Sequence, residues 1–250
     1  MDLEIMAFLA VFGFIGAFID AAVGGGGLIT IPALMWTGLP PVTVLGTNKV
    51  AASMGSVSSF ITFIRAGKMD TALMKKLCPL SFIGSLVGVM LVQYISSEFL
   101  RPLIIVMLIM VFFYTLLKKD WGKHANPQEI TAKKMILCLI MAFTLGFYDG
   151  FFGPGTGSFI MFAFIMIGFD FIGATANAKA MNFASNIAAA ILFSYLGDVS
   201  FTYALPMGVF MMLGAIAGSR VAITKGVSYV RPMFIIVTAV LIGKQILTLL

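Results

Sequence analysis

Long apolar runs separated by short polar stretches make up most of the chain. Ten hydrophobic segments are predicted, near 5–22, 28–37, 47–64, 77–95, 100–117, 135–152, 158–168, 176–195, 201–223 and 230–250. Many of them approach the roughly 20 apolar residues that an α-helix needs to cross a bilayer. They lack the alternation of polar and apolar residues that is typical of outer-membrane barrel strands. The pattern therefore predicts an all-α, polytopic membrane protein.

Composition supports this prediction and narrows the function. Of the 250 residues, 60% are hydrophobic and 10% are charged, against about 25% charged residues in soluble domains. The net charge of +6 does not indicate nucleic-acid binding, because the basic residues lie between apolar runs, as the positive-inside rule expects. The two cysteines are far apart, and no histidine cluster or Ser–His arrangement exists. We therefore expect no cofactor, no metal site and no enzymatic activity.

The sequence repeats itself after about 130 residues. Matching residues are 129 apart up to Gly26 and 130 apart from Gly38 onward. The matches include Asp20 with Asp149, Gly26 with Gly155, Lys49 with Lys179, Gly84 with Gly214, Gly88 with Gly218 and Arg101 with Arg231. We therefore predict a first transmembrane repeat at 1–117, a linker at 118–134 and a second repeat at 135–250.

Positive charges predict the relative orientation of the repeats. In the first half they follow the third segment, at Arg65, Lys68, Lys75 and Lys76. In the second half they appear one connection later, and the linker is also basic. Placing all three groups in the cytoplasm requires an odd number of crossings per half. The halves are therefore predicted to be inverted repeats, with a cytoplasmic linker and both termini outside.

The second segment of each half, with about ten residues, is too short to cross a bilayer, which predicts a re-entrant hairpin. Each is preceded by a glycine cluster, 24–27 or 153–157. Glycine allows unusual backbone angles, so these turns are candidates to hold a substrate. Their predicted substrate-binding residues are Gly25, Gly26, Gly27, Gly155 and Thr156. The alternative is that the glycines only allow close helix packing.

After each hairpin, a polar stretch is predicted to open a helix. The candidate substrate-binding residues there are Thr47, Asn48, Lys49, Ser53, Asn177, Lys179 and Asn182. A helix N-terminus favours an anion, and each lysine adds a full positive charge. In the alternative interpretation, both lysines are anchors whose ammonium groups reach the membrane surface.

Asp20 and Asp149 occupy equivalent positions just before the glycine clusters. A carboxylate within an apolar segment is costly and is a functional candidate by default. It is expected to carry a coupling proton, to pair with a lysine or to cap amides of the glycine turn. Structural capping alone remains an equal alternative.

These motifs resemble the TauE/SafE family of sulfite-exporter-like permeases. The resemblance rests on the hairpin glycines, the turn at 38–41, the stretch at 46–49 and its second-half counterpart, and the region near Gly218 and Arg231. It implies transport of small anions, notably sulfite, sulfonates and related organosulfur compounds, in the prokaryotic cytoplasmic membrane. The second half has Ala178 where the first has Asn48, so two half-sites are not expected to be equivalent.

A secondary transporter of small anions is thus the leading hypothesis. An anion channel and a non-transporting membrane assembly factor are the alternatives. The expected partners are the small anionic substrate, the lipid bilayer and a coupling proton or cation. A homo-oligomer is left open, and nucleic acid is not expected.

The predicted topology is tested by labelling single cysteines in a variant without native cysteines. We expect Ser97→Cys, in the connection before the fifth segment, and Gln128→Cys, in the linker, to react from opposite sides of the membrane. Reaction of both from the same side would remove the basis for inverted repeats.

Overall fold

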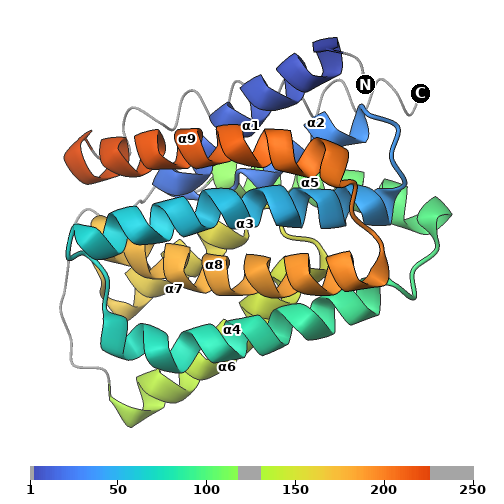
Figure 1. Ribbon diagram of the computed structural model, residues 1–250. Helices are drawn as coiled ribbons and strands as arrows, with labels where there is room; N and C mark the ends of the chain where they lie inside the picture. Colours follow the sequence, from blue (N-terminus) through green and yellow to red (C-terminus); the bar gives the residue numbers. More distant parts are fainter. Residues whose placement is uncertain (1–2, 118–130, 226–250) are drawn as a thin grey trace.

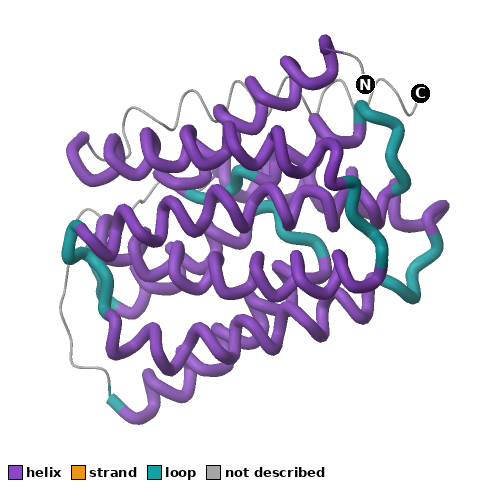
Figure 2. The backbone as a smooth tube through the Cα atoms, in the orientation of Figure 1, coloured by secondary structure: helices purple, strands orange, loops and turns teal. Residues whose placement is uncertain are grey.

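A computed structural model describes residues 3–117 and 131–225 of the chain, and helices are the regular secondary structure within these ranges (Figures 1 and 2). The helices are α1 (Leu3–Val23), α2 (Gly27–Met35), α3 (Pro41–Arg65), α4 (Thr71–Val92), α5 (Ser97–Leu117), α6 (Ala132–Phe151), α7 (Thr156–Ile167), α8 (Phe171–Leu196) and α9 (Phe201–Lys225). The all-α prediction is confirmed for these residues. The segment predicted near 230–250 and most of the predicted linker lie outside the described residues.

Helices α3 and α8 begin earlier than predicted, and their N-terminal residues explain why. Pro41 is the first residue of α3, a position where the fixed φ of proline suits the helix. Asp170 caps α8, because its carboxylate accepts a hydrogen bond from the amide of Gly173 at 2.8 Å, a standard N-cap contact. The predicted starts near 47 and 176 are therefore wrong by more than one turn. The start predicted near 77 is also too late, because Asp70 caps α4 by accepting a hydrogen bond from the amide of Leu73 at 2.9 Å.

Four of the described helices are long and apolar enough to cross a membrane: α1, α4, α6 and α9. Helices α2 and α7 are short, with 9 and 12 residues. Left-handed glycines separate each of them from the helix before it, with φ of 78° and 86° at Gly24 and Gly25 and 101° and 84° at Gly153 and Gly155. L side chains rarely adopt such angles, which explains why glycine occupies both turns.

The two halves of the chain are interleaved. Helix α1 packs along α9, α4 packs along α6, and α3 and α8 pack against each other between these pairs (Figure 1). Glycine makes both outer pairs tight. A Cβ atom at Gly84 or Gly88 of α4 would collide with carbonyl oxygens of α6, and one at Gly214 or Gly218 of α9 would collide with those of α1. Small residues let helix backbones approach in this way inside membranes.

Contacts along the helices give their relative directions. Gly46 of α3 lies against Phe193 of α8, whereas the ring of Phe60 stacks on Phe183 with centroids 5.5 Å apart, so α3 and α8 are antiparallel. Thr47 meets Ser200 at the start of α9, and Gly55 meets Met211 further along, so α3 and α9 are parallel. The successive glycine contacts of α4 with α6 likewise make these two helices parallel.

These directions bring eight of the described Lys and Arg residues to one end of the bundle, which we call the basic end, whereas Arg101 lies near the α2–α3 connection at the opposite end. The basic end combines the end of α3, the starts of α4 and α6, and the end of α9, at the left of Figure 1. Its residues are Arg65, Lys68, Lys75, Lys76, Lys133, Lys134, Arg220 and Lys225. The connections between α2 and α3, α4 and α5, and α8 and α9 lie at the opposite end.

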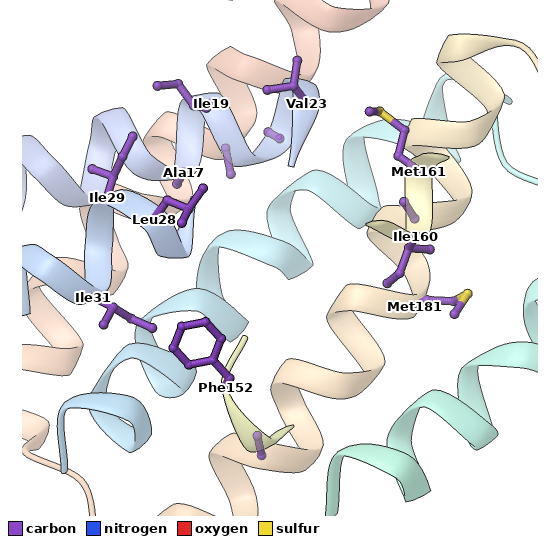
Figure 3. Packing of buried hydrophobic residues seen from close by; sticks show 14 of the residues in the cluster. Ala17, Ile19, Val23, Leu28, Ile29, Ile31, Phe152, Ile160, Met161 and Met181 are labelled. Carbon is purple, nitrogen blue, oxygen red and sulfur yellow. The ribbon is translucent and has the colours of Figure 1, made fainter. Parts of the chain in front are cut away.

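Apolar burial holds the centre of the bundle together. Helices α1, α2 and α7 contribute fully buried side chains to one core cluster, among them Ile19, Leu28 and Ile160 (Figure 3). Because the short helices α2 and α7 are almost entirely apolar and largely buried, packing keeps both turns in the interior.

The tight α4–α6 contact predicts a position-specific loss of stability. Replacing Gly88 with Leu should destabilise the purified protein by at least about 1–3 kcal/mol, because the new side chain overpacks a backbone contact. The neighbouring Val87, 41% exposed, provides the matched control Val87→Leu, for which we expect little change. Thermal unfolding in detergent measures both, and equal melting temperatures for the two variants would contradict the packing described.

Candidate functional site

The two glycine turns meet in the interior of the bundle. The hydroxyl of Ser158 donates a hydrogen bond to the carbonyl oxygen of Val23 at 2.9 Å. Gly24 lies directly against the backbone of Ser158, and Gly27 lies against Pro154. Close packing is therefore one role of these glycines, as the alternative interpretation held. Several of them also border a small cavity at the centre of the bundle, so they do more than allow helices to pack.

Two ion pairs cross between the halves of the chain at this level. Lys49 of α3 pairs with Asp149 of α6, and Lys179 of α8 pairs with Asp20 of α1, each with 2.8 Å between the ammonium nitrogen and a carboxylate oxygen. The side chains of Lys49 and Lys179 are 2% and 1% exposed. The interpretation of these lysines as anchors that reach the membrane surface is therefore wrong. Their charges are held inside the protein.

The prediction that each lysine lies at a helix N-terminus, where free amides would help to bind an anion, is wrong. Lys49 is eight residues after Pro41, the first residue of α3, and Lys179 is eight residues after Phe171, the first residue of α8. Amides two turns inside a helix already have partners in the preceding turn. The ammonium groups and polar side chains remain available for an anion. The N-terminal amides of α3 and α8 are two turns away from the lysines.

Both aspartates are tied down by further hydrogen bonds. Asp20 accepts one from the amide of Gly26 at 3.1 Å, so it caps the first glycine turn as well as pairing with Lys179. Asp149 accepts one from the hydroxyl of Ser185 at 2.5 Å. Two of the roles expected for the aspartates, lysine pairing and capping of the glycine turn, thus occur together at Asp20, and Asp149 also pairs with a lysine.

The two pairs differ in their surroundings. Lys49 donates a second hydrogen bond, to the side-chain oxygen of Asn186 at 3.2 Å. The residue equivalent to Asn186 in the first half is Ser56, 130 positions earlier. The side chain of Asp149 is 2% exposed and that of Asp20 is 24% exposed. The Asp20 carboxylate therefore has more open space around it than the Asp149 carboxylate.

That open space is a small cavity of about 40 Å³ between the ion pairs. The predicted site residues that line it are Asp20, Gly26, Gly27, Asn48, Lys49, Asp149, Gly155 and Asn182. Those that do not line it are Gly25, Thr47, Ser53, Thr156, Asn177 and Lys179. Lys179 nevertheless adjoins it through its partner Asp20.

Three of the predicted residues outside the cavity lining make structural hydrogen bonds instead, two between distant segments and one within α3. Thr47 accepts a hydrogen bond from the amide of Ser200 at 3.0 Å, and its equivalent Asn177 accepts one from the amide of Asp70 at 2.9 Å. Ser53 bonds the carbonyl of Val50 in its own helix at 2.7 Å. Thr47 and Asn177 thus fasten equivalent connections at opposite ends of the bundle.

The list of predicted site residues left out two polar lining residues that share a helical face with the lysines. Ser56 and Asn186 follow Lys49 and Lys179 by seven residues, which is two helical turns. This spacing was the available signal for both. Thr30, Ser59, Gly153 and Gly157 also line the cavity, and the sequence carries no comparable spacing signal for them.

The chemistry of the cavity suits a small anion that competes with a carboxylate. The two ammonium groups and the two carboxylates of these ion pairs have a net charge of zero when all four are ionised. Amide and hydroxyl side chains of Asn48, Ser56 and Asn182 border the same space and can donate hydrogen bonds. Within residues 3–117 and 131–225, no group of three His, Cys, Asp or Glu residues is placed to hold a metal ion.

Comparison with known families agrees with this arrangement. The family model described as sulfite exporter TauE/SafE matches residues 9–244. The chain belongs to the TauE/SafE family. The family suggested by the glycine, lysine and proline motifs is thereby confirmed. No solved structure matches the chain.

Curated relatives of the TauE/SafE chain are named as transporters. It is 40% identical over 231 residues to the probable membrane transporter protein YfcA of Escherichia coli K12, covering 92% of this chain and 85% of the relative. It is 36% identical over 247 residues to a probable membrane transporter protein of Haemophilus influenzae, covering 98% and 96%. A probable membrane transporter protein, ORF9, of Sinorhizobium sp. is 38% identical over 239 residues, covering 95% and 91%.

The crossed pairs predict a characteristic pattern of stability changes. Lys49→Met or Asp149→Asn alone leaves a buried charge without its partner, which costs about 3–5 kcal/mol. The double variant removes both charges and should recover much of this loss. Thermal unfolding of the purified proteins measures the difference, with Lys75→Met as an exposed control. Additive losses in the double variant would mean that Lys49 and Asp149 do not stabilise one another.

Proposed function

We propose that this TauE/SafE chain is a secondary transporter of small anions, with sulfite, sulfonates or related organosulfur compounds as the substrate class. The observation that carries the proposal is the pair of buried ammonium groups beside a small polar cavity. Bringing an anion into a membrane interior without compensation is very costly. Lys49 and Lys179 supply fixed positive charge at the required depth in the protein. The family name and the relatives' names support the same function class.

The size of the cavity favours a small substrate. A volume of about 40 Å³ has room for a few water molecules, since one needs about 10–15 Å³ by the same measure. An inorganic oxyanion or a short-chain sulfonate fits this scale better than a sugar or a nucleotide. The counterpart of Asn48 in the second half is Ala178, which has no amide side chain. The site would therefore be asymmetric around the anion.

We further propose that the halves are inverted repeats with re-entrant hairpins. A two-fold axis that passes between α3 and α8, at right angles to them, would produce both their antiparallel contact and the two crossed ion pairs. The equivalent hydrogen bonds of Thr47 and Asn177 support the same symmetry. If α3 and α8 cross the bilayer, such an axis lies in the membrane plane, as in many secondary transporters. The α1–α2 and α6–α7 turns would then meet near the midplane.

The basic end is proposed to face the cytoplasm of a prokaryotic cell. Both halves of the chain place Lys and Arg residues there, eight in all against Arg101 at the opposite end, and the positive-inside rule associates such an excess with the cytoplasmic side. The location in the cytoplasmic membrane and the outward position of both termini are part of this proposal.

The mechanism we propose is competition between the anion and the aspartates for the lysines. An anion that binds an ammonium group displaces its carboxylate partner at least partly. A buried carboxylate without a counter-charge favours its protonated form. Both aspartates border the cavity, and we take Asp20 as the first candidate for proton uptake with the anion because its more exposed carboxylate is easier for a proton to reach.

Flux of radiolabelled sulfite into proteoliposomes, with and without a pH gradient, tests the function. Lys49→Gln and Lys179→Gln should each weaken apparent affinity at least about tenfold, equivalent to about 1.4 kcal/mol, and by unequal amounts because their surroundings differ. Asp20→Asn should reduce the dependence of flux on the pH gradient. Lys75→Gln, at the exposed start of α4, is the charge-matched control. Folded lysine variants with wild-type affinity would contradict the proposed role of the ammonium groups.

A further inference from the structure

The carboxylate of Asp20 uses its two oxygens on two different donors. Its Oδ2 atom lies 2.8 Å from the ammonium nitrogen of Lys179, and its Oδ1 atom accepts a hydrogen bond from the backbone amide of Gly26 at 3.1 Å. Gly26 is the N-cap residue of α2, so the carboxylate lies at the positive end of a helix. A helix N-terminus beside an ammonium group favours an oxyanion. In this structure a side chain of the protein itself occupies that place.

Asn48 gives a second, independent indication of a ligand here. Asn48 is 5% exposed, and its Oδ1 atom has no hydrogen-bond partner in the part of the chain that the structure describes. Buried polar atoms are nearly always hydrogen-bonded, so an exception calls for a reason. Asn48 lines the same cavity as Asp20, Gly26 and Gly27. Its amide can offer an NH₂ group to an oxyanion or an oxygen to a hydroxyl hydrogen, and a ligand in the cavity would satisfy it.

Glycine backbone encloses the Asp20 carboxylate on two sides. A Cβ atom at Gly157 of α7 would lie 3.3 Å from the ammonium nitrogen of Lys179 and 3.5 Å from Oδ1 of Asp20. A Cβ atom at Gly26 would lie 2.6 Å from the Cβ of Asp20. Larger residues at these positions would fill the space around the carboxylate. The cavity of about 40 Å³ borders Asp20 as well, so a carboxylate that moves into it frees both donors for another oxyanion.

The equivalent aspartate of the second half, Asp149, is held in a different way. Beside its lysine it accepts a hydrogen bond from the side chain of Ser185, and within residues 3–117 and 131–225 it accepts none from an amide of the second glycine turn. Pro154, the counterpart of Gly25, has no amide hydrogen to donate, and its carbonyl oxygen accepts a hydrogen bond from the hydroxyl of Tyr148 at 2.7 Å. The combination of ammonium group and turn amide is therefore specific to the first glycine turn.

We propose that Asp20 is the internal occupant of an oxyanion subsite formed by the ammonium group of Lys179, the amide of Gly26 and the side chain of Asn48. The subsite takes a group with two oxygens on one central atom, because separate donors hold the two oxygens of Asp20. Sulfite, sulfonates and small carboxylates have such a group, whereas a halide offers a single atom and matches less well. Small carboxylates are thereby added to the expected ligands. The subsite rests on the proposed transport function and specifies which atoms exchange the internal carboxylate for the anion.

Removal of the internal carboxylate tests this assignment. In Asp20→Ala, an added anion no longer competes with a tethered carboxylate for the two donors. The melting temperature of the purified protein in detergent is measured while methanesulfonate or acetate replaces chloride at constant ionic strength, because a ligand that binds the folded state raises it. The apparent affinity rises with the fraction of protein whose site is vacant. We expect Asp20→Ala to bind methanesulfonate and acetate at least about tenfold more tightly than the wild-type protein does.

Asp149→Ala is the matched control. It changes the net charge by the same amount and leaves Lys49 without its carboxylate, but no turn amide faces the vacated place. Its affinity for methanesulfonate should stay near the wild-type value. An equal gain in the two variants would overturn the assignment, because any unpaired ammonium group would then suffice. No gain in folded Asp20→Ala, or the same melting temperature of Asp20→Ala in chloride and in methanesulfonate, would overturn it as well.

The unpaired Lys179 makes the stability of Asp20→Ala part of the test. A variant that folds in methanesulfonate or acetate and unfolds in chloride supports the subsite, because the added anion has then replaced the carboxylate. If Asp20→Ala folds in none of these salts, Asp20→Asn decides, because it keeps the size of the side chain without the charge. Tighter methanesulfonate binding than in the wild-type protein supports the subsite, and unchanged affinity overturns it.

Binding in detergent and flux in proteoliposomes fail independently. Tighter binding in Asp20→Ala with no flux of any anion through the wild-type protein would keep the subsite and refute the transport function. Flux through the wild-type protein with no gain of affinity in the folded Asp20 variants would keep transport and refute the subsite.

Discussion

The need to keep a buried charge beside an opposite charge governs the architecture of this protein. An unpaired ammonium or carboxylate group in an apolar interior is so costly that it shifts to its neutral form or finds a partner. Lys49 and Lys179 find theirs in the other half of the chain, at 2.8 Å in both cases. The halves are thereby tied together at the centre, and neither half can bury its lysine or aspartate satisfactorily alone.

The glycine turns and tight helix pairs follow from the same constraint. Asp20 and Asp149 must approach the middle of the bundle, and each does so at the end of a helix that stops at a left-handed glycine turn. The turns can share the interior because Gly24 and Gly27 allow direct backbone contact. Polar backbone at this depth is tolerated only where protein or a cavity surrounds it. The small cavity beside the pairs meets this condition and, in the proposed function, gives an anion access to the lysine charges.

Sequence predicted the helices well, because long apolar runs leave few other structures inside a membrane. It failed at the starts of α3 and α8, where proline at position 41 and Asp170 begin the helix before the polar stretch that resembled an N-terminus. The 129–130-residue offset showed which residues are equivalent, but equivalence does not show which residues touch. The crossed contacts of Lys49 with Asp149 and of Lys179 with Asp20 depend on tertiary packing of helices distant in sequence. Ser56 and Asn186 were within reach of sequence reasoning through their helical spacing, whereas the hydrogen bonds of Ser81 and Ser85 to carbonyl oxygens of α8 were not.

Proton uptake on anion binding is the most direct measure of competition between anion and aspartate for the lysines. Calorimetric titration of the purified protein with methanesulfonate, which does not itself titrate near neutral pH, gives the number of protons exchanged when repeated in buffers of different ionisation enthalpy. We predict uptake of about one proton per bound anion, with a clear decrease in Asp20→Asn. Binding of the anion with the same heat in every buffer, and hence no proton uptake, would contradict displacement of a carboxylate from its lysine.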